Sequence, residues 1–255
     1  MKCTLDADFS SLNAPQAEEW IKNFYKTAEA AFAGMDDRPR LLGNLLVIER
    51  FVNTVRQGLA DNSQNISDGL IYSLDLLWDY LYGKISPLDF QDFANDFYAC
   101  LLAHNVGMWE DDAPRDFYIK YIGKTEHCAY EWMAIEWTSV LLISLVGIAG
   151  GRVDFEDFED CLQIDFYPAA NMADILEEIC VGLINPPLLS HKGSDLAKAH
   201  REVRKTLLFQ QGISCIQRDL KTALTAKPEQ FAALREEYQK YTILPDGYTA
   251  KMLEY

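Results

Sequence analysis

The sequence predicts an all-α fold, a single-domain bundle of about nine or ten helices. Three observations lead to this prediction. Apolar residues recur at helical spacing through most of the chain, strand signals are nearly absent, and Asn, Ser, Pro and Gly stand where helices begin and end. The 255 residues contain no Gly/Ser linker, so we expect one domain over 1–255, with a tail at 245–255 that is either packed or loose.

The helices of the first half are predicted from their ends. Asn13 caps the first helix, and Gly34 lies just past it. Gly83 ends a helix whose apolar stripe contains Trp78, and Ser86 opens the next as a capping-box variant, Ser-Pro-Leu-Asp. The expected helices span 14–33, 38–60, 68–82 and 86–105, with a polar connector at 61–67.

The second half begins with a long apolar helix. Its uncharged run, 137–151, is short for a membrane span and predicts a buried core helix. Asp154 is expected to cap the next helix, and Gly212 is a candidate interruption of a later one. The expected helices span 125–149, 154–166, 168–183 and 194–224, with a last one from Pro228.

Two segments about 65 residues apart share one pattern, in which an apolar helix ends at glycine and alternating Asp and Phe follow. The first reads LDLLWDYLYG-KISPLDFQDFANDF and the second VLLISLVGIAG-GRVDFEDFEDCLQIDF. The pattern predicts a helix-pair pseudo-repeat. Each copy covers only two helices, so a solenoid is not expected.

Charge limits the class of partner. The formal net charge is -16, which argues against nucleic acid or an anionic membrane as a direct partner, because phosphate binding requires clustered Lys and Arg. It favours a basic protein partner, or serves solubility alone. Residues 192–227 are the exception, with 8 Lys and Arg against 3 Asp and Glu. This basic segment either docks on the acidic body, binds a second partner, or is an ordinary solvated helix face.

The six cysteines are scattered singly, without CxxC spacing. This pattern is typical of free thiols in a reducing compartment, where buried cysteine behaves as a small hydrophobe. The N-terminus has no apolar segment of the kind a signal peptide requires. We therefore expect a cytoplasmic protein.

Acidic side chains beside aromatic ones form the candidate partner-binding residues, because this composition is suited to Lys- and Arg-rich protein surfaces. Two helical groups and one loop contribute. The candidates are Asp75, Asp79 and Tyr82, then Asp89, Asp92 and Asp96, then Trp109, Glu110, Asp111, Asp112 and Asp116. The alternatives are a favourable N-terminal helix turn with a solvated face for the second group, and a packing role for Tyr82.

Signs of catalysis are weak. The sequence has no HExxH, no Glu three residues before a His, and no recognisable nucleophile context, so no catalytic residue, metal ligand or cofactor is assigned. A helical enzyme that holds a divalent cation with clustered Asp and Glu stays as an alternative, as does a regulatory protein-interaction module.

One stretch, LDLLWDYLYGKIS within 70–89, resembles small helical immunity proteins of bacterial polymorphic-toxin systems. The resemblance carries no functional residues over to this sequence. It implies a cytoplasmic, non-enzymatic protein that neutralises a cognate toxin by binding it, often by covering a positively charged active site.

Overall fold

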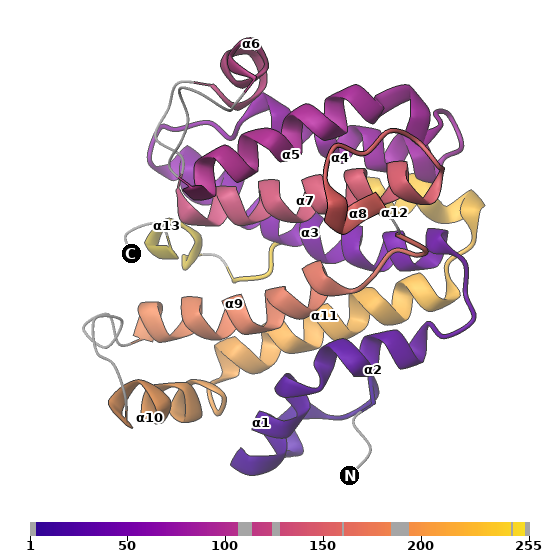
Figure 1. Cartoon of the computed structure of the whole chain (residues 1–255). Coiled ribbons are helices and arrows are strands. Elements are labelled where there is room, and N and C mark those ends of the chain that lie inside the picture. The colour runs from indigo at the N-terminus through magenta and orange to yellow at the C-terminus, as the bar shows by residue number, and fades with distance from the viewer. Residues whose placement is uncertain are drawn as a thin grey trace.

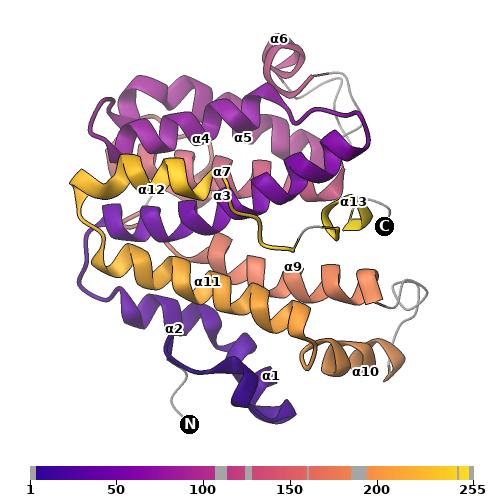
Figure 2. The same cartoon turned by 180° about the vertical axis from the view of Figure 1, so that it is seen from behind.

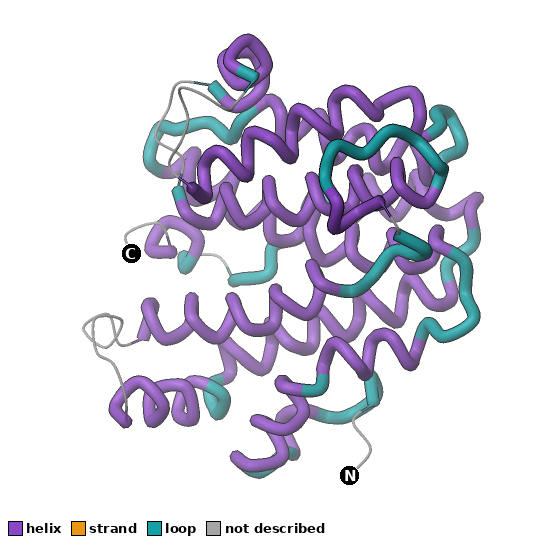
Figure 3. Tube along the Cα trace, viewed as in Figure 1, coloured by secondary structure: helices purple, strands orange, loops and turns teal. Residues whose placement is uncertain are grey.

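The computed structural model describes residues 4–106, 114–123, 128–159, 161–184, 194–245 and 247–252, and within them all regular structure is helical. Figure 3 accordingly shows helices and loops but no strand in the described chain. The longer helices are α1 (Ala14–Lys22), α2 (Phe24–Ala31), α3 (Asp37–Asp61), α4 (Asp68–Leu81), α5 (Gln91–Val106), α7 (Ala129–Ile148), α9 (Tyr167–Ile184), α10 (Ser194–Val203), α11 (Leu207–Thr225) and α12 (Phe231–Tyr238). Short helical segments are η1 (Phe9–Ser11), η2 (Pro87–Phe90), α6 (Arg115–Phe117), η3 (Tyr118–Ile122), α8 (Glu156–Glu159), η5 (Pro228–Gln230) and α13 (Thr249–Met252).

The helices stack in layers around α3. Helices α4, α5 and α7 lie on one side of α3, and α9 and α11 lie on the other (Figure 1). The outer helices α1, α2 and α10 lie beyond α9 and α11, while α12 covers α3 on the reverse side (Figure 2). The all-helical class predicted from the sequence is confirmed for the described residues.

Two expected helices are each divided. The helix expected over 14–33 breaks at Asn23, whose side-chain amide donates to the Glu19 carbonyl at 2.8 Å and so competes with the backbone pattern. The helix expected over 194–224 breaks before Thr206, which caps α11 by accepting from the Phe209 N–H. The described chain therefore contains more helical segments than the nine or ten expected.

Gly212 does not interrupt α11. It lies within the helix, where a Cβ would be only 2.4 Å from Cδ2 of Leu176. This glycine therefore allows α11 to pack closely on α9. The sequence signal was real, but its cause is packing between helices and not a helix end.

The second copy of the pseudo-repeat differs from the first. The first copy is α4 followed by η2 and α5, whereas in the second α7 is followed by the four-residue α8 and non-helical chain from 161 to 166. Side chains of α3 hold this chain: Arg40 donates to the Ile164 carbonyl at 3.0 Å, and Asn44 to the Asp165 carbonyl at 2.8 Å. These contacts hold the chain at 164 and 165 in its non-helical conformation.

Helix α3 is buried over most of its length even though it carries polar side chains. Arg50 is the clearest case: its Nε donates to Oδ2 of Asp219 on α11 at 2.6 Å. Its guanidinium also lies 4.7 Å from the ring centroids of both Tyr238 and Tyr241. The Tyr238 hydroxyl donates to the other Asp219 oxygen at 2.8 Å. A buried charge with this many partners is compatible with a folded core.

The C-terminal segment packs against the same helix. The Asn53 amide donates to the carbonyls of Tyr238 and Tyr241, and the Ile243 N–H donates to the Thr54 hydroxyl at 2.9 Å. Met252, in α13, is buried. The described part of the tail, 247–252, is thus packed against α3, and the looser alternative does not describe it.

Helix α7 is the buried core helix expected for 137–151. Among the described helices it alone is long and apolar enough to cross a membrane, and 72% of its most apolar window is buried inside the bundle. Helix α7 ends with Gly150 in a left-handed conformation at φ +68, as expected for the glycine-rich end of this helix.

We predict that Trp78→Ala destabilises the protein by roughly 3–5 kcal/mol. Trp78 is fully buried and its indole N–H donates to Oε1 of the buried Glu49 at 2.8 Å, so the change removes packing and one hydrogen bond to a buried carboxylate. Urea unfolding measures the loss. Leu162→Ala, at a side chain that is 89% exposed, serves as the control and is expected to change stability by less than about 0.5 kcal/mol.

We predict that denatured, unreduced protein titrates six thiols with Ellman's reagent. The five described cysteines are free. In the native protein Cys100 and Cys180 should react last, because burial raises the pKa of each thiol to about 12 and the thiolate is the reactive form. A titre of four or fewer in denatured protein contradicts the fully reduced state.

Candidate partner-binding surface

The structure separates the predicted acidic residues into two groups. Asp75 and Asp79 lie in the second half of α4 and Tyr82 directly follows it, and Arg235 of α12 contacts Asp75. The residues of η2 and α5 lie beside the chain that leads into α8, on the side seen in Figure 1. Asp116 is exposed on α6. Trp109, Glu110, Asp111 and Asp112 lie outside the described residues.

The α4 group is engaged by cations of the same chain. Asp75 forms an ion pair with Arg235 of α12. Asp79 binds Lys84 at 2.7 Å, and the Lys84 ammonium lies 4.8 Å from the centroid of the Tyr82 ring. Tyr82 is half-buried, as in the packing alternative considered for it. These side chains already have the charge partners that a basic protein would have to supply.

Arg235 completes this arrangement. Its guanidinium lies 5.7 Å from the centroid of the Trp78 ring, and its Nε lies 3.8 Å from Oε1 of Glu49. Burial raises the pKa of Glu49, while Trp78 and Arg235 favour its carboxylate form. Acidic and aromatic side chains do bind a guanidinium here. That guanidinium belongs to the same chain, however, and its helix lies about 160 residues away in sequence.

Asp89 has a structural role at the start of the α5 group. Its Oδ2 accepts from the Ser86 N–H at 2.7 Å, and the Ser86 hydroxyl accepts from the Leu88 N–H at 3.1 Å. This is the capping box predicted from Ser-Pro-Leu-Asp. Asp89 is exposed, so its capping role leaves one face of the carboxylate open to solvent.

Asp92 and Asp96 face an acidic segment that follows α7. The buried Asn95 side chain ties the two together, because its amide donates to the Arg152 carbonyl and its oxygen accepts from the Asp154 N–H, both at 2.9 Å. Arg152 bridges Asp92 at 3.1 Å and Asp154 at 3.4 Å. Burial, and then the charge of Asp92, raise the pKa of Asp96.

Helix α8 extends the acidic surface because it lies close to α7. A Cβ on Gly147 would be 2.5 Å from the Phe158 carbonyl oxygen, so glycine permits this approach. Tyr98 of α5 packs against Phe155 and Phe158, at 4.6 and 5.2 Å between ring centroids. We call the combined set the α5–α8 acidic surface; it consists of Asp89, Asp92, Asp96, Asp154, Glu156 and Asp157.

Sequence reasoning missed the second half of this surface. Asp154, Glu156 and Asp157 belong to the second Asp/Phe segment, which the sequence pattern predicts as a separate helix. The shared Asp/Phe pattern was the available signal. It marked two segments that lie side by side, with α5 packed along α7 and α8 packed on α7.

The basic segment docks in part on the acidic body. On α9, Glu177 lies 2.6 Å from Nδ1 of His200 and 3.0 Å from Nε of Arg204. Farther along, Lys221 binds Asp6 at 2.8 Å. Internal docking is therefore the alternative that the contacts favour for this segment.

In the described part of the chain, no three His, Cys, Asp or Glu side chains are placed so that they could hold a metal ion together. The acids of the α5–α8 acidic surface spread along the surface and do not converge on one point. They form a negatively charged surface next to partly exposed aromatic rings.

No known protein family, curated protein or solved structure matches this chain. We therefore describe the protein by its own fold and surface. It is an all-helical protein with a buried central helix that carries polar side chains, and with an acidic face next to aromatic rings.

We predict that Gly147→Ala destabilises the protein by about 1–3 kcal/mol, even though alanine favours an isolated helix by about 1 kcal/mol over glycine. The new methyl group would meet the Phe158 backbone and push α8 away from α7. Urea unfolding followed by circular dichroism measures the change. Equal or greater stability than wild type contradicts the close approach of α8.

Proposed function

We propose that this chain is a non-enzymatic binding protein of the immunity type, which neutralises a cognate bacterial toxin by direct binding. The α5–α8 acidic surface carries the proposal. Among its six carboxylates lies a cation, Arg152, which pairs with Asp92 and Asp154. The Asp92 side chain is nevertheless 80% exposed. A basic toxin surface complements this excess of negative charge.

The environment of two side chains supports a cationic partner. The pKa of Asp96 is raised by burial and by the neighbouring charges of Asp92 and Asp154. The pKa of Tyr98 is raised by burial and by the charges of Asp157 and Glu136. Burial is the main cause of both shifts, and the neighbouring carboxylates add to it because their negative charge disfavours a further anion there. A partner's Lys or Arg would offset this negative charge.

An apolar anchor stands next to the charged residues. Leu162 follows α8 by three residues and is 89% exposed, the most exposed large apolar side chain in the described chain. Charged groups mainly accelerate encounter, whereas apolar contacts at an interface slow dissociation. We therefore place the partner across α5, α8 and Leu162, and assign Asp75, Asp79 and Tyr82 to internal contacts.

We predict that Asp92→Lys with Asp157→Lys slows association with the partner and flattens its salt dependence. Both side chains are exposed, and Asp89 is left unchanged because its substitution would remove a helix cap. The partner is first captured from a lysate of the source organism with the wild-type protein. Association rates are then measured between about 50 and 500 mM salt, over which the Debye length shrinks several-fold.

The matched control is Glu229→Lys with Glu236→Lys, which changes the net charge equally on exposed positions of η5 and α12. It should retain most of the wild-type rate. A captured partner whose association rate does not respond to salt, or which responds equally to both double variants, would falsify a specific role for the α5–α8 acidic surface. A metal-dependent enzyme, by contrast, would gain thermal stability with magnesium, manganese or zinc.

A further inference from the structure

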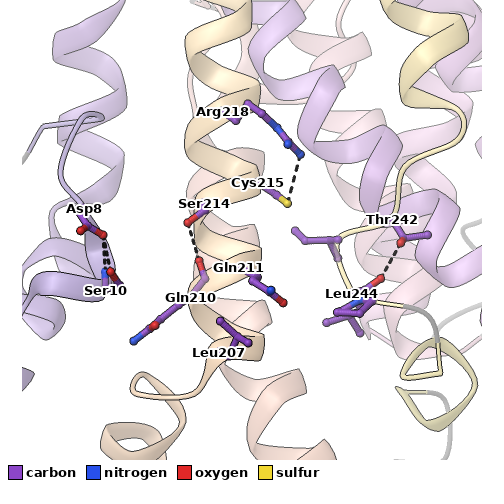
Figure 4. A pocket seen from close by; sticks show the side chains of 12 residues that line it. Asp8, Ser10, Leu207, Gln210, Gln211, Ser214, Cys215, Arg218, Thr242 and Leu244 are labelled. Carbon is purple, nitrogen blue, oxygen red and sulfur yellow. Dashed lines mark hydrogen bonds between the residues drawn. The ribbon is translucent and has the colours of Figure 1, made fainter.

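Two hollows adjoin on the outer face of α11. One, of about 500 Å³, lies toward the start of the helix and the segment 242–245. The other, of about 680 Å³, lies along the segment 6–8 and the later turns of α11. They share Asp8, Ser214 and Arg218, so they meet at these side chains. Figure 4 shows Asp8 and Ser10 on one side of α11 and Thr242 and Leu244 on the other.

The N-terminal wall of this groove is fixed to the bundle. The amide of the buried Gln217 donates to the carbonyls of Leu5 and Ala7, at 3.1 and 2.9 Å. Phe9 is buried, with its ring centroid 5.4 Å from that of Trp20. The wall is therefore present before any ligand arrives.

The C-terminal wall is equally well held. The Ile243 N–H donates to the Thr54 hydroxyl at 2.9 Å, and Ile243 and Leu244 are buried. Both walls are anchored to buried helices, so the groove is preformed. A volume of about 500 Å³ lies in the range of sites for small molecules, roughly 300–1,000 Å³.

The groove is less acidic than the rest of the molecule: two carboxylates, Asp6 and Asp8, and two cations, Arg218 and Lys221, line it, and Lys221 pairs with Asp6 at 2.8 Å. Helix α11 carries a single carboxylate, Asp219, which is buried and bound to Arg50. Arg218 is exposed at the junction of the hollows, and no carboxylate of the described residues lies within ion-pair distance of it. Its Nη2 donates to Sγ of Cys215 at 3.5 Å, which leaves most of its donors unused.

The remaining lining is suited to an amphipathic molecule. Leu207 is 69% exposed at one end of the first hollow, and Leu244 and Pro245 line its side. Amide and hydroxyl groups fill the space between, from Gln210, Gln211, Ser10, Ser214 and Thr242. A guanidinium is the side chain best matched to a carboxylate, because its fork of N–H donors binds both oxygens.

We propose that this groove binds a small amphipathic carboxylate, whose acid group pairs with Arg218 and whose apolar part lies against Leu207, Leu244 and Pro245. The groove is separate from the α5–α8 acidic surface, so the test of this proposal does not depend on the immunity function. A ligand here covers Cys215, which is half-buried in the wall of the hollow. That thiol provides the readout.

The test uses sodium octanoate as the probe and octanamide as its uncharged analogue. Alkylation of each cysteine by iodoacetamide is followed by peptide mass spectrometry in the full-length protein. Octanoate should slow the alkylation of Cys215 and leave that of Cys161 unchanged, since Cys161 is also half-buried but lies by α8. Octanamide should protect at least about tenfold more weakly, as expected when a charge-assisted hydrogen bond is lost.

Arg218→Gln should reduce protection by octanoate to the level of octanamide. Protection is compared with and without probe within each variant, because Arg218 itself lowers the pKa of the Cys215 thiol against the effect of burial. Arg115→Gln is the matched control, an exposed arginine on α6 that should keep full protection. The proposal is overturned if octanoate does not protect Cys215, if octanamide protects equally, or if both arginine variants behave alike.

Discussion

The burial of α3 is the constraint on which the rest of the structure depends. A helix in the centre of a bundle is normally apolar all round, but this one brings Arg40, Asn44, Glu49, Arg50 and Asn53 into the core. Each such side chain needs a partner, because a buried polar group without one costs free energy. The partners come from α4, α11, the chain after α8 and the C-terminal segment. The central helix thus fixes the positions of four distant parts of the chain.

This constraint also decides which acids remain for a partner. Where a carboxylate lies near the central helix, a cation of the same chain reaches it, as Arg235 reaches Asp75 and Arg50 reaches Asp219. Farther out, along α5 and α8, carboxylates gather around Arg152. Carboxylates near the central helix thus stabilise the fold through internal ion pairs, whereas those along α5 and α8 face solvent. It also leaves α11 with a neutral, polar outer face between two fixed walls.

Local signals predicted local structure well. Gly83, Ser86 and the end of α7 stand where their sequence context placed them, because capping depends on neighbours within one helical turn. Long-range pairing was not predictable in this way. Nothing near Asp75 indicates that Arg235 will meet it, and nothing near residue 164 shows that Arg40 will hold its carbonyl outside a helix. The sequence indicates many acidic side chains, but which of them pair internally and which face solvent depends on such long-range contacts.

The contact of Arg50 with Asp219, Tyr238 and Tyr241 has a consequence for how the protein is made. Arg50 leaves the ribosome well before its carboxylate partner, Asp219, and its aromatic partners come later still. Until then the central helix has a charge that cannot be buried at low cost. Folding from the N-terminus during synthesis, the usual order for separate domains, cannot complete this core. The nascent chain can therefore complete this core only after residue 241 has been made, and a product that stops earlier leaves Arg50 without some of its partners.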